Sequence, residues 1–379
     1  MKKNIIISGG GTGGHIIPAI AIGEAIEKID NNIEVIYVSG DKKVERKFYK
    51  DKNCRRIPIK VVQKGFTGKI RGLFNIINSI RISIRLIKEL KPIAVIGTGG
   101  YVSGPVLFAA YLLRVPTLIQ EQNSLPGKTN RFLAKFVDEI SASYEGSLKY
   151  FKRKNVKLLG NPIIIKDKGI TREEALKKFN LRNDKPICLI FGGSQGSLKI
   201  NKIVLETIQK GLIKDLDLQV IWICGLGKYF EEIKKGLEGI ETGKLDLRVY
   251  EYIEDMDVAE KITDFGVTRA GAITLTELAY YGIPSILVPY PFAKEDHQRL
   301  NAQEMINTGS CKMILDAELT PETLANKIKE MLSDRKKLLE MKEKIKQFSR
   351  PQSAIEIAKQ TIELAKRKKI YLPQRHYEH

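Results

Sequence analysis

Short apolar runs that end in glycine-rich loops and lead into helical patterns recur along the whole chain. The loops follow runs ending at residues 8, 98 and 191 and occupy residues 9–15, 99–104 and 192–197. Continuous apolar runs of this length, closed by glycine and followed by a helix, are typical of buried parallel strands. The sequence therefore predicts an α/β fold with two doubly wound, Rossmann-like domains.

A fourth unit of the same kind spans residues 263–302. Its short apolar segment leads into the turn 269–272, then a helical pattern that contains Glu277, and a second apolar run after Gly282. Small residues at a helix N-terminus can take a phosphate, and a carboxylate deeper in the helix can accept hydrogen bonds from both hydroxyls of a ribose. An ordinary turn with a surface glutamate is the alternative for this stretch alone.

The chain carries a large excess of positive charge. Its 379 residues include 64 lysines and arginines against 44 aspartates and glutamates, a formal net charge of +20. Nucleic acid, an anionic membrane surface and phosphorylated substrates are the partners that such a charge suggests. A single tryptophan, and no basic motif interleaved with aromatic residues, argue against nucleic acid.

Cysteine and hydropathy patterns indicate a soluble protein of a reducing compartment. The four cysteines are far apart and form no CxxC pair, so we expect neither disulfides nor a zinc site. The charged start runs straight into an apolar strand pattern, so we expect no signal peptide. No uncharged run reaches the roughly 18 residues of a membrane span.

His15 closes the first glycine loop at the expected start of a helix. The helix dipole disfavours a protonated imidazole there, which leaves a neutral ring available as a base or a donor; a structural histidine is the alternative. The loop fits the dinucleotide-binding fingerprint poorly, because the acidic residue expected at the end of the next strand, Asp41, comes only after Gly40. A nicotinamide-dependent enzyme is therefore the runner-up.

Residues 69–91 form an amphipathic segment. The side expected to face the core consists of Ile70, Leu73, Ile77, Ile80, Ile84 and Ile87. Another face mixes cationic and apolar side chains, namely Arg71, Phe74, Arg81, Ile82, Arg85 and Lys88. Such a face suits an anionic lipid surface, and a solvated basic face is the alternative.

Three short polar motifs mark further positions. The motif EQN at 121–123 follows an apolar run, where open α/β sheets bind ligands. After GNP at 160–162 the chain becomes charged and turn-rich, so we place a domain junction there. The motif DMD at 255–257 resembles a metal-binding DxD, but a helix N-terminal cap explains it more simply.

Seven motifs occur together in one order. They are GGGTGGH at 9–15, TGGYVSGP at 98–105, EQN at 121–123, GNP at 160–162, GGSQGS at 192–197, TRAGAITLTEL at 268–278 and HQ at 297–298. This set closely resembles the MurG family of UDP-N-acetylglucosamine transferases, which act on the undecaprenyl-pyrophosphoryl-MurNAc-pentapeptide lipid of peptidoglycan synthesis. The resemblance covers nearly the whole chain.

The resemblance implies a GT-B architecture, in which two doubly wound domains face each other across a cleft. Residues 1–160 would bind the acceptor lipid and face the membrane, and residues 161–348 would bind the donor. The last helix, 349–379, would pack back on the first domain. The family inverts the anomeric centre and needs no metal for chemistry, so we expect no cofactor.

The resemblance also assigns roles to individual residues. For UDP-GlcNAc these are Thr12, Gly13, Gly14, Asn123, Ser194, Gln195, Ile253, Met256, Gly271, Ala272, Glu277, His297 and Gln298. For the acceptor and its pyrophosphate they are Gly11, His15, Gly99, Gly100, Tyr101, Ser103 and Gly104. The basic and apolar face of 69–91 would rest on the anionic cytoplasmic leaflet, alongside other proteins of cell-wall synthesis, cell shape and division.

The chain departs from the family pattern at two places. Gln120 stands where members often carry a histidine, so residue 120 is not expected to be a base. Residues 163–165 are isoleucines where many members have an arginine, which leaves one uracil or phosphate contact unassigned.

The expected reaction is an in-line attack of the MurNAc C4 hydroxyl on the anomeric carbon of GlcNAc, with UDP as the leaving group. His15 is the first choice for the general base, and Glu121 is the second. A nucleotide-sugar epimerase and a non-catalytic binder of lipid pyrophosphate are the alternatives. An epimerase would not need the cationic face or the loop 99–104, and a binder would not need Glu277.

Overall fold

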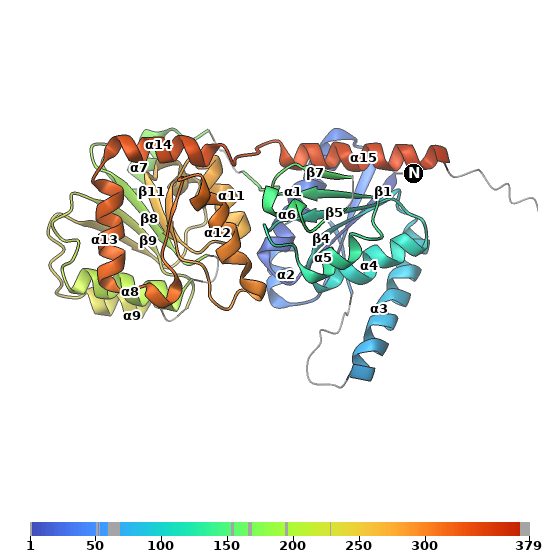
Figure 1. Ribbon diagram of the computed structural model, residues 1–379, viewed down its shortest axis with the longest axis horizontal. Coiled ribbons are helices and arrows are strands. Elements are labelled where there is room, and N and C mark those ends of the chain that lie inside the picture. Colours follow the sequence, from blue (N-terminus) through green and yellow to red (C-terminus); the bar gives the residue numbers. More distant parts are fainter. Residues whose placement is uncertain are drawn as a thin grey trace, which may run out of the picture. The chain divides into compact units, whose positions relative to one another are not determined.

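The computed structural model describes residues 2–50, 52, 54–59, 69–152, 155–165, 169–193, 196–227 and 229–371. Within helices it does not describe the side chains of residues 44, 69–74 and 368–371. The chain divides into two compact units, one of Met1–Ile164 with Arg350–His379 and the other of Ile165–Ser349. Each unit is a parallel sheet covered by helices (Figure 1). The predicted doubly wound α/β fold is confirmed.

The first unit contains a seven-stranded sheet in the order β3-β2-β1-β4-β5-β6-β7. Its strands are β1 (Lys3–Gly9), β2 (Ile33–Ser39), β3 (Arg55–Pro58), β4 (Ala94–Gly99), β5 (Thr117–Glu121), β6 (Glu139–Ala142) and β7 (Val156–Leu158). Its helices are α1 (Gly13–Ile29), α2 (Lys43–Tyr49), α3 (Lys69–Leu90), α4 (Gly100–Leu112), α5 (Lys128–Leu133), α6 (Glu145–Leu148) and α15 (Ser353–Tyr371). The strand order reverses between β1 and β4, so the loops after these two strands flank the switch point where such sheets bind ligands.

Both faces of the first sheet are buried, which explains the continuous apolar strand runs. Along β1, Ile5 and Ile7 pack into one cluster with α1 and α15, and Ile6 packs into the other with α4. Successive side chains of a strand point to opposite faces, so a strand covered on both sides has to be apolar throughout.

Helix α15 belongs to the first unit although it comes last in the chain. It packs on α1, and Ser353 Oγ donates to the Gly160 carbonyl at 2.9 Å. The sequence placed the domain junction after residue 160, and the structure divides the units after Ile164.

The second unit contains a six-stranded sheet in the order β10-β9-β8-β11-β12-β13. Its strands are β8 (Ile187–Phe191), β9 (Gln219–Ile223), β10 (Asp246–Tyr250), β11 (Phe265–Thr268), β12 (Ser285–Leu287) and β13 (Lys312–Met313). Its helices are α7 (Arg172–Phe179), α8 (Leu198–Gln209), α9 (Tyr229–Leu237), α10 (Met256–Ile262), α11 (Ala272–Tyr281), α12 (His297–Asn307), α13 (Pro321–Leu332) and α14 (Arg335–Lys346), with short 3-10 turns at Lys294–Asp296 and Asp316–Glu318. The loops after β8 and β11 flank its switch point.

The ends of α11 follow from its sequence. Gly271 occupies the N-cap position with extended backbone angles, and Gly282 ends the helix in the left-handed conformation at φ +69°. Glycine adopts that conformation without a Cβ clash, and Pro284 cannot continue a helix. The predicted strand, turn, helix and strand of residues 263–302 are therefore confirmed.

Candidate functional site

The two glycine loops of the first unit lie directly against each other. The Gly10 amide donates to the Gly99 carbonyl at 3.4 Å. A Cβ at Gly100 would lie 2.1 Å from the Gly10 carbonyl oxygen, and a Cβ at Gly9 would lie 2.0 Å from Thr98 Oγ1. These glycines are required by the close approach of the two loops. The predicted role of Gly100 at the acceptor pyrophosphate stays a prediction.

Glu45 is the residue on which the first loop closes, and sequence reasoning missed it. Its buried carboxylate accepts from the amides of Gly11 at 2.9 Å, Gly40 at 3.1 Å and Lys42 at 2.7 Å. The Tyr101 hydroxyl donates to the same carboxylate at 3.3 Å. Burial, followed by the charge of Glu45, raises the pKa of Tyr101 to about 12. The Gly11 amide and the Tyr101 hydroxyl are thus engaged within the protein and are not free for a pyrophosphate, which corrects both predictions.

His15 is oriented through its Nδ1 atom. Its Nδ1 lies 3.0 Å from the Thr98 carbonyl oxygen and 3.1 Å from Gln122 Oε1. The Gln122 amide nitrogen donates to the Thr98 carbonyl at 2.6 Å, so the amide oxygen is the atom that faces His15. Both atoms beside Nδ1 are therefore acceptors, which assigns the proton to Nδ1 and leaves an unprotonated Nε2.

A buried network of polar side chains holds Gln122 in place. Gln120 Nε2 donates to Asn161 Oδ1 at 3.2 Å and to Ser143 Oγ at 3.2 Å. Asn161 Nδ2 donates to the Gln122 carbonyl at 3.0 Å. The motifs EQN and GNP, which are distant in sequence, thus meet behind His15. Gln120 serves this network, in agreement with the expectation that residue 120 is not a base.

Glu121 does not fit the role of a base. It is 1 % exposed, and its carboxylate accepts from the amides of Asn123 at 2.9 Å and Gly127 at 3.1 Å and from Asn130 Nδ2 at 2.8 Å. These bonds fix the loop that follows β5, and Asn123 Nδ2 donates to the same carboxylate at 3.2 Å. The prediction that Glu121 could be the base is therefore corrected. Its carboxylate fixes the loop around Asn123.

Ser103 is also closed off from a ligand. It is fully buried, accepts from the Gly99 amide at 3.1 Å and donates to the Ser8 carbonyl at 2.6 Å. Gly104 is partly exposed in the first turns of α4, where a Cβ would meet Thr129 at 3.2 Å. Ser103 therefore connects β1 to α4. The prediction that Ser103 contacts the acceptor lipid is corrected.

The start of α1 offers open backbone donors. Thr12 is exposed at the N-cap position and makes no side-chain cap bond, and Gly13 and Gly14 are partly exposed in the first turn. Amides in the first turn of a helix have no acceptor inside the helix and carry the positive end of its dipole. Together with His15, these residues form the part of the first loop that can address an anion.

In the second unit, the loop after β8 and the turn after β11 are the segments that can address an anion. Ser194 and Gln195 lie outside the described residues. A Cβ at Gly271 would have no heavy atom nearer than 3.8 Å, so the space in front of α11 is open there. Ala272 is the first residue of the helix, and its small side chain is 8 % exposed. This helix N-terminus is suited to a phosphate group.

Arg269, missed as a functional residue by sequence reasoning, fixes the turn before α11. It is 8 % exposed, and its Nη1 lies 2.6 Å from Asp316 Oδ1. Its other bonds reach the Val288 carbonyl at 3.1 Å and Ser197 Oγ at 2.8 Å. One guanidinium therefore ties together the loops that follow β11 and β12 and the start of α8.

Glu277 lies on α11, and its carboxylate makes no hydrogen bond or ion pair within the described part of the chain. It keeps partial exposure to solvent. Burial raises the pKa of Glu277 to about 7. A carboxylate with free acceptor positions, at the side of a phosphate-binding helix start, can receive two hydroxyl donors.

The segment before α10 brings Ile253 and Met256 into the cluster under β8 and β9, where both are partly buried. Asp255 occupies the N-cap position of α10 but makes no cap bond, and its carboxylate pairs with Lys178 at 2.8 Å. The expected capping bond is thus wrong in detail. Among the described residues, no group of three or more His, Cys, Asp and Glu side chains is arranged to hold a metal.

His297 and Gln298 begin α12 and are partly exposed. His297 Nδ1 lies 2.9 Å from the Lys294 carbonyl oxygen, and Gln298 Oε1 accepts from the Tyr290 amide at 2.9 Å. The two residues before the helix, Glu295 and Asp296, both have left-handed backbone angles, at φ 53° and 56°. Non-glycine residues adopt this conformation at a cost, which is typical of functional turns.

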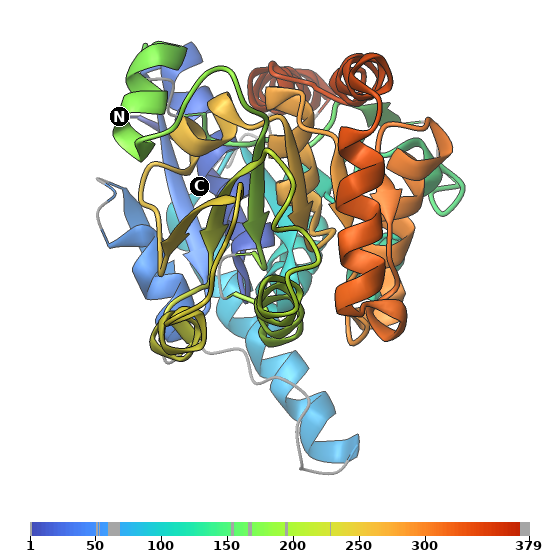
Figure 2. The same cartoon turned by 90° about the vertical axis from the view of Figure 1, so that its left-hand side faces the viewer.

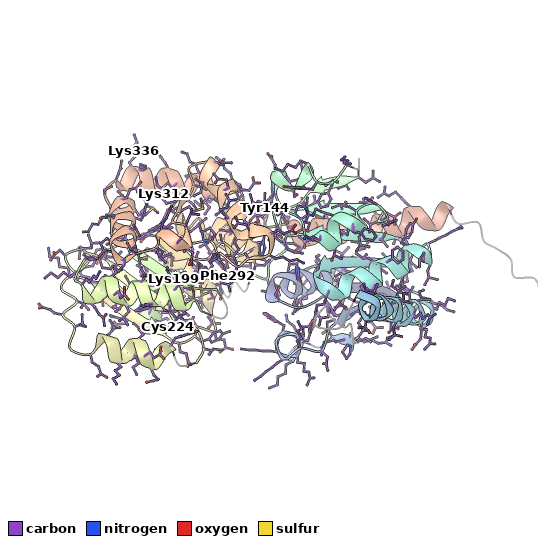
Figure 3. All side chains as sticks on the ribbon, turned by 60° about the horizontal axis from the view of Figure 1, so that its bottom comes forward. Tyr144, Lys199, Cys224, Phe292, Lys312 and Lys336 are labelled. Atoms are coloured by element: carbon purple, nitrogen blue, oxygen red, sulfur yellow. The ribbon has the colours of Figure 1, made fainter. Side chains whose placement is uncertain are left out.

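An aromatic side chain that the sequence did not single out lies in the same loop. Phe292 is 83 % exposed and projects from the second unit (Figure 3). Its ring centroid is 5.7 Å from that of Tyr290, and the Arg269 guanidinium lies 5.5 Å from the Tyr290 ring. An apolar surface is thus exposed beside the start of α12.

Helix α3 extends beyond the rest of the first unit in both views (Figures 1 and 2). Its inner side consists of Ser79, Ser83, Ile87 and Leu90, which are buried on the side where α3 packs against α4. Ile77, predicted to face the core, is 39 % exposed, and Ile76 is 43 % exposed. The prediction is wrong for Ile77, whereas Ile87 of the same stripe is buried and Ile80 and Ile84 are half-buried.

The predicted basic face of α3 is present where its side chains are described. Arg81, Arg85 and Lys88 are exposed and Ile82 is half-buried, whereas the side chains of Arg71 and Phe74 lie outside the described residues. Cations therefore share the exposed surface of α3 with isoleucines. No helix within the described ranges is long and apolar enough to cross a bilayer.

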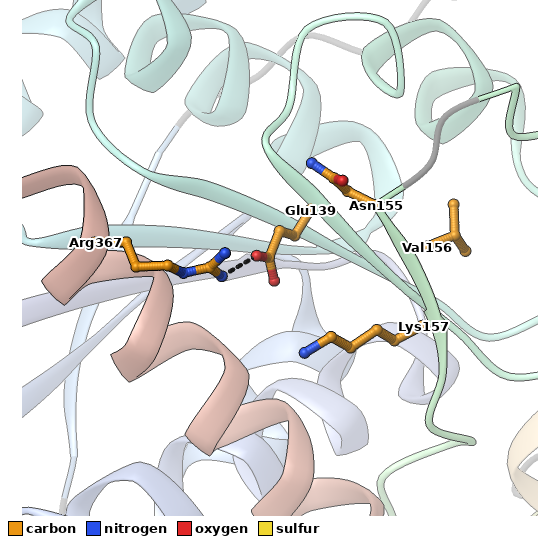
Figure 4. A pocket seen from close by; sticks show the side chains of 5 residues that line it. All are labelled: Glu139, Asn155, Val156, Lys157 and Arg367. Atoms are coloured by element: carbon orange, nitrogen blue, oxygen red, sulfur yellow. Dashed lines mark hydrogen bonds and ion pairs between the residues drawn. The ribbon is translucent and has the colours of Figure 1, made fainter. Parts of the chain in front are cut away.

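A pocket of about 180 Å³ lies elsewhere, between β6, β7 and α15 of the first unit (Figure 4). Its lining residues are Glu139, Asn155, Val156, Lys157 and Arg367. Arg367 pairs with the buried Glu139, which also accepts from Gln360 Nε2 at 2.7 Å. None of these residues was a predicted site residue, and the pair fastens the last helix to the sheet.

Family comparisons match both halves of the chain. Residues 5–142 match the model of the glycosyltransferase family 28 N-terminal domain, and residues 187–357 match the model of its C-terminal domain. A protein of Desulforamulus reducens is 39 % identical over 93 % of this chain and 96 % of its own length. A protein of Finegoldia magna is 38 % identical over 95 % of this chain and 98 % of its own length. Both are named "UDP-N-acetylglucosamine--N-acetylmuramyl-(pentapeptide) pyrophosphoryl-undecaprenol N-acetylglucosamine transferase".

Solved structures give the same fold. The crystal structure of Acinetobacter baumannii MurG superposes with a TM-score of 0.78 at 27 % identity, covering 96 % of this chain and 100 % of that one. A UDP-GlcNAc 2-epimerase from Neisseria meningitidis, bound to UDP-GlcNAc, superposes with a TM-score of 0.67 at 12 % identity, covering 95 % and 100 %. At that identity the epimerase shares the fold alone.

Proposed function

The chain belongs to glycosyltransferase family 28, among the MurG transferases, and on that premise we propose how its residues carry out the reaction. It has the GT-B fold and is an N-acetylglucosaminyltransferase of peptidoglycan synthesis. It transfers GlcNAc from UDP-GlcNAc to the C4 hydroxyl of MurNAc in undecaprenyl-pyrophosphoryl-MurNAc-pentapeptide, which converts lipid I to lipid II.

His15 is the general base in this proposal. Its Nε2 takes the proton of the C4 hydroxyl while the hydroxyl oxygen bonds to the anomeric carbon, and the bond to UDP breaks with its electron pair on the diphosphate. The observation that carries this assignment is the position of Nδ1 between the Thr98 carbonyl and Gln122 Oε1, because it keeps the proton off Nε2. The open amides of Gly13 and Gly14 support anion binding beside the base.

The second unit binds the donor. The N-terminus of α11 at Gly271 and Ala272 receives the diphosphate, and the Glu277 carboxylate accepts from the ribose hydroxyls. His297 and Gln298 address the sugar hydroxyls, since their main-chain contacts hold them at the start of α12. Uracil meets the backbone of Ile253 and the side chain of Met256, and the loop with Ser194 and Gln195 completes the diphosphate site.

The first unit binds the acceptor pyrophosphate. The loops around His15 and Gly99, Gly100 and Gly104 supply the site, with Asn123 at its side. The closed positions of Ser103 and Glu121 give these two residues supporting roles.

Helix α3 attaches the protein to the cytoplasmic face of the membrane. Its exposed Ile76 and Ile77 can enter the interface while Arg81 and Arg85 meet anionic headgroups. Replacing Arg81 and Arg85 with glutamate is expected to abolish binding to vesicles that contain anionic lipid, whereas Lys336→Glu and Lys337→Glu on α14 leave it intact. Sedimentation with vesicles at low and high salt measures this, and equal binding of both double variants contradicts the membrane role of α3.

Incubation with labelled UDP-GlcNAc and a short-chain analogue of the acceptor lipid tests the transfer itself. We expect a disaccharide-lipid and UDP as products. An epimerase is the second candidate, because the epimerase fold is shared. Conversion of UDP-GlcNAc to its 2-epimer without a disaccharide-lipid would overturn the transferase function.

A further inference from the structure

The two chain segments that join the units meet inside the first unit. The chain leaves this unit after Ile164 and returns to it at Arg350. Gly160 and Arg350 lie against each other, because a Cβ at Gly160 would be 2.6 Å from the Arg350 Cβ. Gly160 also has a φ of +86°, a conformation that a side chain would strain. Residues 160–162 and 350–353, which we call the crossing point, are therefore closely packed.

The first turn of α15 is bonded to this crossing point. Ser353 is 1 % exposed, and its Oγ donates to the Gly160 carbonyl at 2.9 Å. The Ser353 amide donates to the Arg350 carbonyl at 3.0 Å, and the Gly160 amide donates to the Ala142 carbonyl of β6 at 3.2 Å. One serine thus fastens the outgoing segment to the returning one.

Asn161, the next residue, joins the crossing point to the loop after β5. It is 4 % exposed, and its Nδ2 donates to the Gln122 carbonyl at 3.0 Å. Its Oδ1 accepts from Ser143 Oγ at 2.7 Å and from Gln120 Nε2 at 3.2 Å. A buried amide with partners at both ends is held in one orientation. The Gln122 main chain is therefore fixed by Asn161.

The Gln122 side chain extends this series of bonds to His15. Gln122 is 1 % exposed, and its Oε1 lies 3.1 Å from His15 Nδ1. A shift of the Gln122 main chain would move this oxygen and take one acceptor away from Nδ1, since hydrogen bonds weaken steeply with poor geometry. The bonds Ser353–Gly160, Asn161–Gln122 and Gln122–His15 thus follow one another from α15 to the ring.

We propose that Asn161 is a positioning residue for the transfer reaction and that Ser353 holds it in place. Asn161 acts through Gln122, whose amide oxygen keeps the proton of the neutral His15 ring on Nδ1. This inference rests on His15 as the general base proposed above. The orientation of the base then depends on the place where the chain leaves and re-enters the first unit, and not on the glycine loop alone.

Nitrogen-15 NMR of the histidine side chains tests this proposal without a substrate. The chain has four histidines, at 15, 297, 376 and 379, and the spectrum of His15→Ala identifies the signals of residue 15. Couplings from the carbon-bound ring protons report which nitrogen carries the proton. The spectra are recorded at about pH 8.5, about two units above the ordinary pKa of a histidine, so that a neutral ring is observed.

Three variants separate positioning from general support of the unit. Asn161→Ala removes the donor to the Gln122 carbonyl, and Ser353→Ala removes a single hydroxyl. Arg367→Ala is the matched control, because it breaks the ion pair with Glu139 farther along α15 and leaves the crossing point intact (Figure 4). Circular dichroism confirms that each variant is folded.

The expected results differ among the variants. Asn161→Ala should raise the fraction of His15 rings protonated on Nε2 and lower kcat about fivefold, the effect of about one hydrogen bond, with the KM for UDP-GlcNAc within about twofold. Ser353→Ala should shift both quantities in the same direction by about twofold. Arg367→Ala should lower stability and leave both unchanged. A merely structural role of Asn161 would lower stability and leave the protonated nitrogen of His15 unchanged.

Three results overturn the proposal. One is an unchanged ratio of the two His15 tautomers in folded Asn161→Ala, and Ser353→Ala decides in the same way if Asn161→Ala does not fold. Another is an equal loss of kcat in Ser353→Ala and Arg367→Ala, which would show that α15 acts only by stabilising the unit. The third is near-normal turnover of His15→Ala, which would remove the base itself and this inference with it. If His15→Ala loses turnover and Asn161→Ala does not, the base stands and only the positioning role fails.

Discussion

The polar groups of the first unit's site bond to one another, whereas the Glu277 carboxylate of the second unit's site bonds to no described residue. Around His15, the Glu45 carboxylate, the Gln122 amide and the Thr98 carbonyl all have partners within the protein. In the described part of the second unit, the Glu277 carboxylate makes no such bond. The first site is thus organised before any ligand arrives, and the second retains acceptors for a ligand to fill.

The difference suits the two tasks. A general base works only if its ring is held in one orientation and one tautomer, and bonds within the protein provide both. A donor site gains affinity when the ligand satisfies groups that the free protein leaves unsatisfied. Such groups lower the stability of the free protein, as is common at binding sites.

Removal of the organised base should give the largest effect. His15→Ala is expected to lower turnover at saturating substrates about 1000-fold, because proton transfer then falls to water. UDP-GlcNAc binding to the second unit should be unchanged. His297→Ala serves as the matched histidine control, since it should weaken donor binding and leave proton transfer in place. Near-normal turnover of His15→Ala would remove this residue from the role of base.

The pH dependence of the free energy of unfolding tests the second unit's site. Burial raises the pKa of Glu277 to about 7, above its ordinary value of 4.5. The folded state therefore holds this proton more tightly than the unfolded state, so the contribution is full below about pH 4.5 and is lost as pH rises through 7. The second unit is expected to lose about 2 kcal/mol between pH 5 and 8, and Glu277→Gln should remove most of that loss.

Fluorescence of Trp222 measures this prediction. Trp222 is the single tryptophan of the chain and is fully buried in the second unit. Urea unfolding at several pH values, in the natural protein and in Glu277→Gln, gives the difference directly. Parallel curves for the two proteins would show that Glu277 does not hold the proton.

A smaller loss of turnover is expected when the Gln122 side chain, which orients His15, is removed. Gln122→Ala leaves Thr98 as the single acceptor for His15 Nδ1, so turnover is expected to fall about tenfold. The apparent pKa of the base in the pH–rate profile should also move, which a loss of packing alone would not cause. Gln120→Ala is the matched control, because it disturbs the same network without touching His15. An identical profile in Gln122→Ala would contradict the tautomer assignment.

Sequence patterns predicted the elements well, because strand burial and glycine turns are local signals. The strand, turn and helix around Gly282 followed from them. Glu45 and Arg269 were missed because their partners are distant: Gly11 lies 34 residues from Glu45, and Asp316 lies 47 residues from Arg269. A charged stretch such as KKVERK gives no sign that one of its residues closes a loop.

The error at α3 has a similar cause. The helix has apolar residues on several faces, so periodicity alone could not select the buried side. Ser79 and Ser83 are buried against α4 because small side chains allow close helix packing. Ile77 is exposed as a result, and this exposure is what gives α3 an apolar surface.

Urea unfolding of Glu45→Gln and Glu277→Gln without ligand tests the contrast between the two sites most directly. Glu45→Gln should lower the stability of the first unit by about 2 kcal/mol, because an amide cannot accept from all three backbone donors. Circular dichroism follows this loss, and the Trp222 transition reports the second unit. Glu277→Gln should leave the Trp222 midpoint unchanged or raised at pH 8. A loss of stability in Glu277→Gln as large as that in Glu45→Gln would contradict the account.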